Sequence, residues 1–359
     1  MNYITLFVVS LLVSVLIVLT KNWHGRWTLD PIAGIQKQHK VPTARIGGIA
    51  ILAGLIAAYF LTQHSVQRII GCLLIAGAPA FIFGLLEDLT KKISVFVRLC
   101  ATISSGIIAS YISGVSMQDT GVVSFDWLLS FPLIAILFTG FAVGGVANAV
   151  NIIDGFNGLA VGAAAIMLSA IGLISLNVGD IDLATVCFLC VAIALGFGLV
   201  NWPKGRLFLG DGGAYLIGFV LAWMAIKLPM RSADINAWAT LVVCTYPVLE
   251  VGFSVRRRLR RQRGHSGQPD NLHLHHLIHS RIVRHWLPKQ SALIQNGMTS
   301  PICWLITVIP AAWAIVFAKS TPMLALGFFG FVVAYAAVYA RLSQFGWCFR
   351  ARTLRPVGV

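Results

Sequence analysis

Charge is scarce in this sequence. Only 11% of its 359 residues are Asp, Glu, Lys or Arg, whereas 58% are hydrophobic, and the mean hydropathy is +0.84. A soluble domain carries about 25% charged residues. The longest polar stretch runs from about 256 to 300, which is too short for a second domain. The composition therefore excludes an ordinary soluble protein and predicts one membrane domain over 1–345, followed by a basic cytoplasmic tail over 346–359.

Two further signals are missing. No small-residue cleavage site follows the first apolar segment, so we expect a retained helix rather than a signal peptide. The seven cysteines are scattered in or near apolar segments, and Cys187 and Cys190 lie inside one of them. This placement is typical of small buried residues and gives no sign of a redox pair.

Apolar stretches of the length that a spanning helix needs, about 20 residues, occur eleven times. Backbone groups in lipid must be satisfied internally, so the stretches predict an all-α integral membrane protein, a polytopic bundle of about 11 transmembrane helices. Several stretches are short, which leaves ten helices as the alternative. The stretches are 2–20, 46–62, 69–86, 98–115, 127–147, 158–176, 183–200, 212–227, 238–255, 301–318 and 322–340.

Basic residues are unevenly divided between the two sets of connections. Of the 27 Lys and Arg, 23 fall in one set or, like Arg98, at its edge; the other set holds Arg68, Lys227, Arg231 and Lys319. The positive-inside rule then predicts a periplasmic N-terminus and a cytoplasmic C-terminus. This rule, with attraction to anionic membrane lipid, accounts for the net charge of +15 without a nucleic-acid partner. The basic set comprises 21–45, 87–97, 148–157, 201–211, 256–300 and the tail.

Acidic residues number only twelve, and half of them fall in the basic connections. They lie beside Gly and Asn at helix ends, as expected of an anion- and metal-binding surface. A transport site at the membrane midplane would place charges in helix centres or in paired broken helices, and we find neither. A transporter or flippase of an anionic lipid-linked substrate remains the alternative, because it shares the basic face. The six residues are Asp30, Glu87, Asp88, Asp154, Asp211 and Asp270.

Two acidic stretches each have a simple structural interpretation beside a functional one. Glu87 and Asp88 end an apolar stretch and are followed by lysines, which is also typical of a solvated helix end. Asp154 precedes Gly155, where backbone can approach a ligand closely. The same stretch, 148–160, would also serve as a helix cap, although a cap needs one polar residue and this stretch supplies several.

The stretch Gly210-Asp211-Gly212-Gly213 precedes the eighth apolar segment. Glycine-rich backbone at a helix N-terminus is typical of a phosphate site, and a plain cap is the alternative. Asp211 would repel phosphate unless a cation lay between them. Since Mg²⁺ favours one or two carboxylates plus phosphate oxygens, we predict that Asp211 binds Mg²⁺.

Histidines and arginines dominate the segment 256–279, where six Arg precede His273, His275, His276 and His279. A zinc site and a positive-inside cluster are the alternatives, but surrounding Arg would repel a metal. We favour recognition of an anion, with His and Arg donating to phosphate or sugar. His39 and Arg45, in the basic segment 35–48, are open to the same interpretation.

Together these motifs resemble the polyprenyl-phosphate N-acetylhexosamine-1-phosphate transferases, glycosyltransferase family 4. They occur in family order: K-x-H-x-x-P-x-x-R-x-G-G at 37–48, an acidic pair at 87–88, N-A-x-N-x-x-D-G at 148–155, F-L-G-D-x-G at 208–213 and D-x-x-H-x-H-H at 270–276. The last form resembles the branch that uses UDP-N-acetylglucosamine and related sugars. The chain departs from the family at Glu87 and Asn157, where Asp is usual, and at Glu250, where relatives often have Asp.

The resemblance implies transfer of a HexNAc-1-phosphate from a UDP-N-acetylhexosamine to undecaprenyl (polyprenyl) phosphate, with release of UMP. It implies a multi-pass protein of the bacterial inner membrane with a cytoplasmic active site, Mg²⁺ (or Mn²⁺) as cofactor, and an initiating role in a surface polysaccharide such as O-antigen. A homodimer is a further expectation, and a two-step route through an Asp nucleophile stays open. The implied catalytic residues are Asp88, Asp154 and Glu87; the implied substrate-binding residues are Asn148, Asn151, Arg45, His39, His273, His275, His276 and Asp270.

Overall fold

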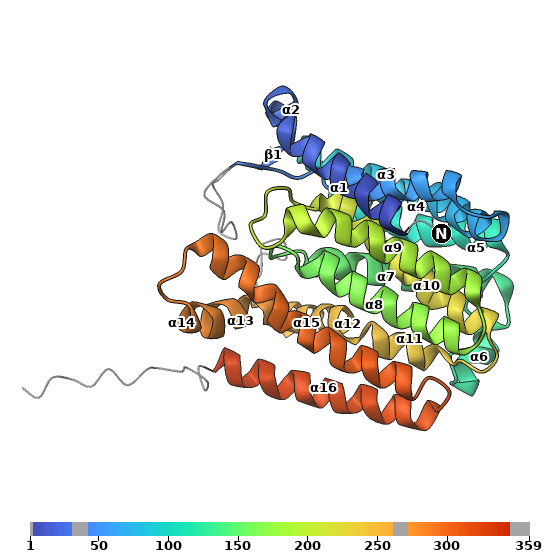
Figure 1. Ribbon diagram of the computed structural model, residues 1–359. Helices are drawn as coiled ribbons and strands as arrows, with labels where there is room; N and C mark the ends of the chain where they lie inside the picture. The colour runs from blue at the N-terminus through green and yellow to red at the C-terminus, as the bar shows by residue number, and fades with distance from the viewer. Residues whose placement is uncertain (1–2, 31–41, 261–271, 345–359) are drawn as a thin grey trace, which may run out of the picture.

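The computed structural model describes residues 3–30, 42–260 and 272–344, and this part of the chain is almost entirely helical (Figure 1). Strands β1 (Leu29–Asp30) and β2 (Thr43–Ala44) form a small antiparallel pair. The helices are α1 (Tyr3–Leu19), α2 (Lys21–Thr28), α3 (Gly48–Leu61), α4 (His64–Thr90), α5 (Val95–Ser113), α6 (Val123–Leu129), α7 (Pro132–Ile153), α8 (Leu159–Asn177), α9 (Ile181–Asn201), α10 (Gly210–Arg231), α11 (Ala237–Val243), α12 (Thr245–Arg260), α13 (Leu274–Ile278), the π-helix η1 (His279–Val283), α14 (Arg284–Trp286), α15 (Ala292–Val316) and α16 (Thr321–Ser343).

Eight of the described helices are long and apolar enough to cross a membrane. Two bent pairs, α1 with α2 and α11 with α12, raise the number to ten if each is one span, and α3 is a shorter apolar helix of 14 residues. The prediction of an all-α polytopic membrane protein is therefore confirmed. The number of spans and the orientation of the termini stay predictions.

Helix α10 forms the centre of the bundle. Every residue from Gly210 to Pro229 is buried, and the helix packs against α3, α4, α5, α7, α8, α9 and α11. Small residues make this possible: a Cβ added to Gly218 would lie 2.8 Å from the Cα of Ala147 in α7. Close approach through small residues is the usual way for membrane helices to pack.

The connections predicted to share one membrane side lie at one end of the bundle. In Figure 1, α2, α13 and α14 lie at the left end, whereas α6 and the N-terminus lie at the right end. At the right end the exposed ion pairs Arg231–Asp180 and Lys319–Asp234 join neighbouring connections. The alternating pattern of the sequence therefore matches the two ends of the structure.

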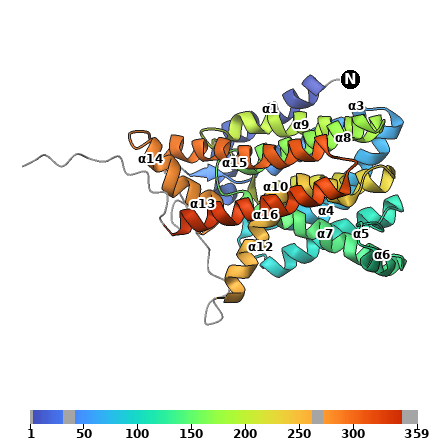
Figure 2. The ribbon, with the colours of Figure 1, turned by 90° about the horizontal axis from the view of Figure 1, so that it is seen from below.

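The segment 238–255, predicted as one helix, is divided into α11 and α12. The chain breaks at Cys244, and α12 is bent by 76° from α11. Figure 2 shows α12 projecting away from the other helices. Pro247 explains the break, because it has no N–H to donate to the carbonyl of Val243 and so cannot continue the helical ladder.

Other helices extend further than the sequence predicts. Asn148–Ile153 was assigned to a loop but forms the last turns of α7, because polar side chains there find partners in neighbouring helices. The segment 256–300 was also assigned to a loop. Where the structure describes it, α12 extends to Arg260, α13, η1 and α14 follow, and α15 begins at Ala292.

Candidate functional site

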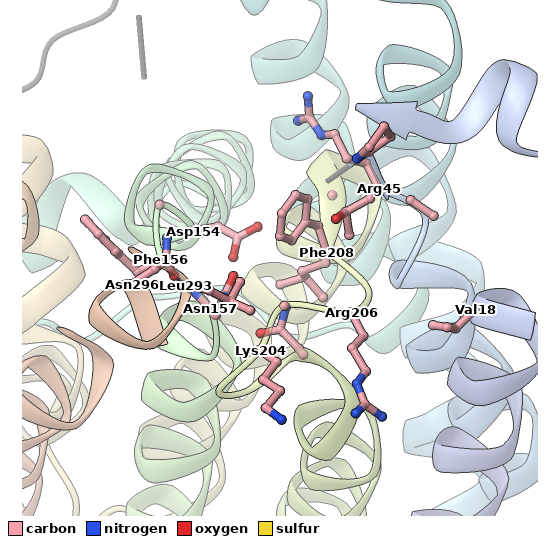
Figure 3. Close-up of a pocket in the computed structure, with 18 of the residues that line it drawn as sticks. Val18, Arg45, Asp154, Phe156, Asn157, Lys204, Arg206, Phe208, Leu293 and Asn296 are labelled. Atoms are coloured by element: carbon pink, nitrogen blue, oxygen red, sulfur yellow. Dashed lines mark hydrogen bonds between the residues drawn. The ribbon is translucent and has the colours of Figure 1, made fainter. Parts of the chain in front are cut away.

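A cavity of about 740 Å³ opens at the end of the bundle that carries α2 and α13. Its described lining comes from the α1–α2 corner, residues 42–45, the turn after α7, residues 201–210, His276 and the start of α15. In Figure 3 the Asp154 carboxyl points into the space that these segments surround. The described lining includes four cations, Lys21, Arg45, Lys204 and Arg206, but one carboxylate, Asp154. Such a wall favours an anionic ligand.

Backbone pairing holds Arg45 beside the start of α10. Phe208 donates its backbone N–H to the Ala44 carbonyl (2.9 Å), and Gly47 and Gly48 donate theirs to the carbonyls of Phe208 (3.0 Å) and Leu209 (3.0 Å). The two glycine-containing motifs, 160 residues apart in the sequence, thus lie side by side. Gly210 has a φ of +74°, a left-handed conformation that glycine adopts without strain.

Asp88 caps the N-terminus of α10. Its two carboxylate oxygens accept the backbone N–H groups of Asp211 (3.0 Å) and Gly212 (2.9 Å), and the residue is 2% exposed. A carboxylate suits the positive end of a helix. The glycine-rich motif predicts a phosphate at these N–H groups, but in the structure they donate to Asp88. Its implied catalytic role remains a prediction, while its contacts hold the backbone of Asp211 and Gly212 in place.

The side chain of Asp211 is surrounded by donors from three segments. Its side chain accepts from Arg45 (3.3 Å), from the Asn151 amide (3.2 Å) and from Arg98. Arg45 also lies 3.5 Å from Asp88. Two arginines therefore balance two buried carboxylates directly behind the cavity wall.

Asp154 follows the last turn of α7 and lies on the cavity wall. Although its side chain is only half-buried, the protein packed around it disfavours the charged form and raises its pKa to about 7. Arg45 opposes this shift, whereas the negative charges of Asp211 and Asp88 add to it. Three carboxylates thus share one region and would gain from an additional cation.

The raised pKa of Asp154 predicts a pH-dependent effect on stability. An unfolded Asp has a pKa of about 3.9, so between about pH 4 and pH 7 the folded protein binds this proton more tightly than the unfolded chain does. Stability from this group therefore falls as the pH rises through that range. Asp154→Asn removes the titration, so the Tm of the variant minus that of wild type, measured in detergent with EDTA, should increase from pH 5 to pH 8.

The matched control for this series is Asp119→Asn, an exposed residue in the connection between α5 and α6. A Tm difference for Asp154→Asn that stays constant with pH, as the control difference should, would contradict the assignment.

The other predicted residues of the acidic motifs divide into two groups. Asn151 reaches Asp211, as described. Asn148 does not come to the cavity: its amide donates to the Thr102 hydroxyl (2.8 Å) and the Gly144 carbonyl (2.8 Å), which joins α7 to α5. Glu87 accepts the backbone N–H of Ile93 (2.7 Å) and so closes the turn before α5.

The His motif packs against the turn that carries Asp154. His276 lines the cavity, and Phe156 contacts the rings of His275, His276 and His279 at centroid distances of 5.0–5.8 Å. Burial lowers the pKa of His276 to about 3, with His275 adding to the effect, so this ring is neutral near pH 7. A neutral ring still offers one N–H donor and one acceptor to a ligand.

Asn157, where the family has Asp, links three segments of the cavity wall. Its backbone N–H is donated to Asn296 (2.9 Å), its amide donates to the Pro203 carbonyl (3.1 Å), and Ser300 donates to its carbonyl (2.6 Å). A carboxylate at this position would have no hydrogen to offer Pro203. Asn at this position therefore allows a hydrogen bond to Pro203 that Asp would not make.

Some predicted residues lie outside the described part of the chain, and some residues of the site were missed. His39 and Asp270 fall among residues that the structure does not describe. Three basic residues contributed only to the predicted membrane orientation of the chain: Arg98, Lys204 and Arg206. The position of Lys204 and Arg206 just before the F-L-G-D motif was the available signal, whereas nothing local marked Arg98 as a partner of Asp211.

No group of three or more His, Cys, Asp or Glu within 3–30, 42–260 and 272–344 forms a ready metal site. Asp211 nevertheless fits a divalent cation that is shared with a substrate, because Mg²⁺ is commonly held by one or two carboxylates plus phosphate oxygens. Burial first, and then the negative charges of Asp211 and Asp88, raise the pKa of Asp154, and a cation bound in this region would oppose that shift.

Comparison with known proteins gives a consistent family. The profile described as glycosyl transferase family 4 matches residues 70–229, which contain the acidic pair and the Asp154 and Asp211 motifs. Two proteins named undecaprenyl-phosphate alpha-N-acetylglucosaminyl 1-phosphate transferase are similar. That of Yersinia pestis is 28% identical over 280 residues, 76% of this chain and 74% of the relative. That of Escherichia coli strain K12 is 29% identical over 251 residues, 68% and 67% respectively.

A more distant relative covers more of the chain. A probable undecaprenyl-phosphate N-acetylglucosaminyl 1-phosphate transferase of Bacillus subtilis strain 168 is 23% identical over 315 residues, 86% of this chain and 82% of the relative. The profile, the relatives and the order of the motifs agree. The chain is similar to glycosyl transferase family 4 over residues 70–229, and to undecaprenyl-phosphate N-acetylglucosaminyl 1-phosphate transferases over two thirds or more of its length.

Proposed function

We propose that this protein transfers an N-acetylhexosamine 1-phosphate from its UDP-sugar to undecaprenyl phosphate and releases UMP. The observation that carries the proposal is the basic cavity at one end of an apolar bundle, with Asp211 directly behind its wall. Two anionic substrates must meet in this reaction, one soluble and one in the membrane. The names of the relatives support the lipid acceptor and the N-acetylglucosamine 1-phosphate group. They give no support to the flippase alternative.

The proposed chemistry is a single displacement at phosphorus. An oxygen of the lipid phosphate forms a bond to the β-phosphorus of the donor, and the bond from that phosphorus to the bridging oxygen breaks. UMP leaves with the electron pair, and the sugar phosphate stays on the lipid as a pyrophosphate. Lys21, Arg45, Lys204 and Arg206 would neutralise the two anions and hold them together, which supplies much of the catalysis in phosphoryl transfer.

Asp211 would hold the divalent cation, Mg²⁺ or Mn²⁺, with Asn151 orienting its carboxylate. When bound, such an ion neutralises the diphosphate and stabilises the charge that develops on the leaving group. Asp154 would contact substrate directly from the cavity wall, and a pKa near 7 lets it accept a proton at neutral pH. His276 would donate to phosphate or sugar as a neutral ring. Asp88 and Glu87 stay in the proposed catalytic set, the former through its hold on Asp211.

The cellular setting is also part of the proposal. The cavity would face the cytoplasm of a bacterial inner membrane, since the basic connections gather at its end of the bundle. The step would begin a surface polysaccharide such as O-antigen, and a homodimer would be the assembled form.

The experiment that tests the function is a donor panel. Purified protein with undecaprenyl phosphate and Mg²⁺ is incubated with UDP-GlcNAc, UDP-GalNAc, UDP-glucose and UDP-glucuronic acid, and UMP is quantified. We expect UMP from at least one N-acetylhexosamine donor and only in the presence of the lipid phosphate. UMP from no N-acetylhexosamine donor would refute the proposal.

A further inference from the structure

Glu250 is a fully buried carboxylate that lies next to the His motif without lining the cavity. It belongs to α12, the helix that follows the break at Cys244. One carboxylate oxygen accepts the backbone N–H of Leu274 (3.0 Å), the first residue of α13. The same carboxylate lies 3.1 Å from Nδ1 of His273 and 3.5 Å from Nδ1 of His275. One side chain thus holds the start of α13 and the preceding His273, and it lies beside His275.

These contacts determine which nitrogen of His273 carries hydrogen. An ionised carboxylate accepts hydrogen bonds and donates none. Nδ1 of His273 must therefore carry the hydrogen that it shares with Glu250, which leaves Nε2 as the acceptor in the neutral ring. A partner that orients one nitrogen of a histidine sets the chemistry of the other.

The effect of Glu250 extends to the cavity through ring packing. The rings of His273 and His275 are parallel, with centroids 5.3 Å apart and an interplanar angle of 3°. His275 packs on His276 at 4.6 Å, and His276 lines the cavity. A Cβ added to Gly155 would lie 3.1 Å from Nε2 of His275. The position of His275 therefore constrains both His276 and the turn that carries Asp154.

We propose that Glu250 is a positioning residue for this site. It holds His273 with hydrogen on Nδ1, anchors the start of α13 through Leu274, and so sets the position of His275, of His276 and of the Asp154 turn at the cavity wall. The inference rests on the proposed function for its kinetic consequences, but its structural part does not.

The kinetic test compares Glu250→Gln with Glu250→Asp. Gln has nearly the size of Glu, but its NH2 group is a donor. Placed against the Nδ1–H of His273, it would either repel that ring or favour the tautomer with hydrogen on Nε2. Asp is shorter and keeps an acceptor-only group. We expect Gln to lower kcat for UMP release about 10- to 100-fold, as loss of an orienting partner does, with KM for the UDP-sugar changed less than about threefold. Asp should retain more activity than Gln.

A double-mutant cycle tests the route. If Glu250 acts through His273, the loss in Glu250→Gln combined with His273→Ala should be close to the larger single loss. The matched cycle of Glu250→Gln with Lys204→Ala, a distant cation on the cavity wall, should instead show multiplied losses. A packing role alone would give Gln more activity than Asp, and it would multiply the losses in both cycles; either result overturns the proposal.

A measurement independent of activity separates this proposal from the proposed function. Protein labelled with ¹⁵N-histidine reports the hydrogen on each ring nitrogen, and His273→Gln identifies the His273 signals by their loss. We expect the Nδ1–H form of His273 in wild type and a different form in Glu250→Gln. An unchanged His273 spectrum overturns the positioning role, whereas wild type that makes no UMP but shows the expected spectra overturns only the proposed function.

Discussion

Asp211→Asn is expected to lower UMP release by about 10²- to 10³-fold or more, in line with the loss of a preorganised charge at a reacting phosphate. The amide keeps the shape of the side chain but removes the charge that Arg45 and Arg98 contact. It also removes the carboxylate that fits a divalent cation. We therefore expect Mg²⁺-dependent binding of the UDP-sugar, measured by calorimetry, to weaken together with turnover.

The matched control for Asp211→Asn is Asp182→Asn at the opposite end of the bundle, where the carboxylate accepts only the Ser65 hydroxyl among the hydrogen bonds of the described chain. This variant should bind and turn over like wild type. Wild-type turnover in Asp211→Asn would remove the central residue of the site and leave the alternative of a simple helix cap.

Gly84→Ala is the second change expected to have a large effect. A Cβ at this position of α4 would lie 2.6 Å from both the Cα and the backbone nitrogen of Gly212, so α10 would have to move. Overpacking a core costs about 1–3 kcal/mol when side chains can adjust, and backbone adjusts less readily. The displaced turn also carries Asp211, which directly precedes Gly212. The backbone N–H groups of both residues donate to Asp88. We expect a lower Tm in detergent and a loss of UMP release of about 10-fold or more in the protein that folds.

Gly145→Ala provides the control for this substitution. Gly145 lies in α7, and a Cβ there would meet no atom within 4 Å. Alanine favours helix over glycine, so this variant should match wild type in Tm and activity. Equal behaviour of Gly84→Ala and Gly145→Ala would show that α10 has room to move.

The fold was predictable where hydrophobicity decides the structure. Each of the eleven apolar stretches lies in helical segments, because about 20 apolar residues in lipid have no other way to satisfy their backbone. The break at Cys244 was missed since the apolar run continues across it, although Pro247 marks the position. The helical turns after Ala147 were missed for the opposite reason: Asn148 and Asn151 look like loop residues until their partners in other helices are known.

The sequence identified most residues of the site but not the contacts between them. The motifs identified Asp154, Asp211, Arg45 and His276, which do converge at one end of the bundle. Asp88 was identified as well, but its contact with the backbone N–H of Asp211 joins residues 123 positions apart. No local pattern encodes such a contact. The same limit applies to Glu250, which lies 23 residues from His273 and is separated from it by a basic segment.

The most direct test of the central claim follows the β-phosphorus of the donor. UDP-N-acetylglucosamine labelled with ³²P at the β-phosphate is incubated with purified protein, Mg²⁺ and undecaprenyl phosphate, and the lipid is extracted into organic solvent. Transfer of the sugar with its phosphate predicts label in the lipid, unlabelled UMP in the aqueous phase, and neither product with Asp211→Asn. Label that stays in the aqueous phase as UDP while the sugar moves to lipid would contradict the account, and so would the absence of lipid label from every N-acetylhexosamine donor.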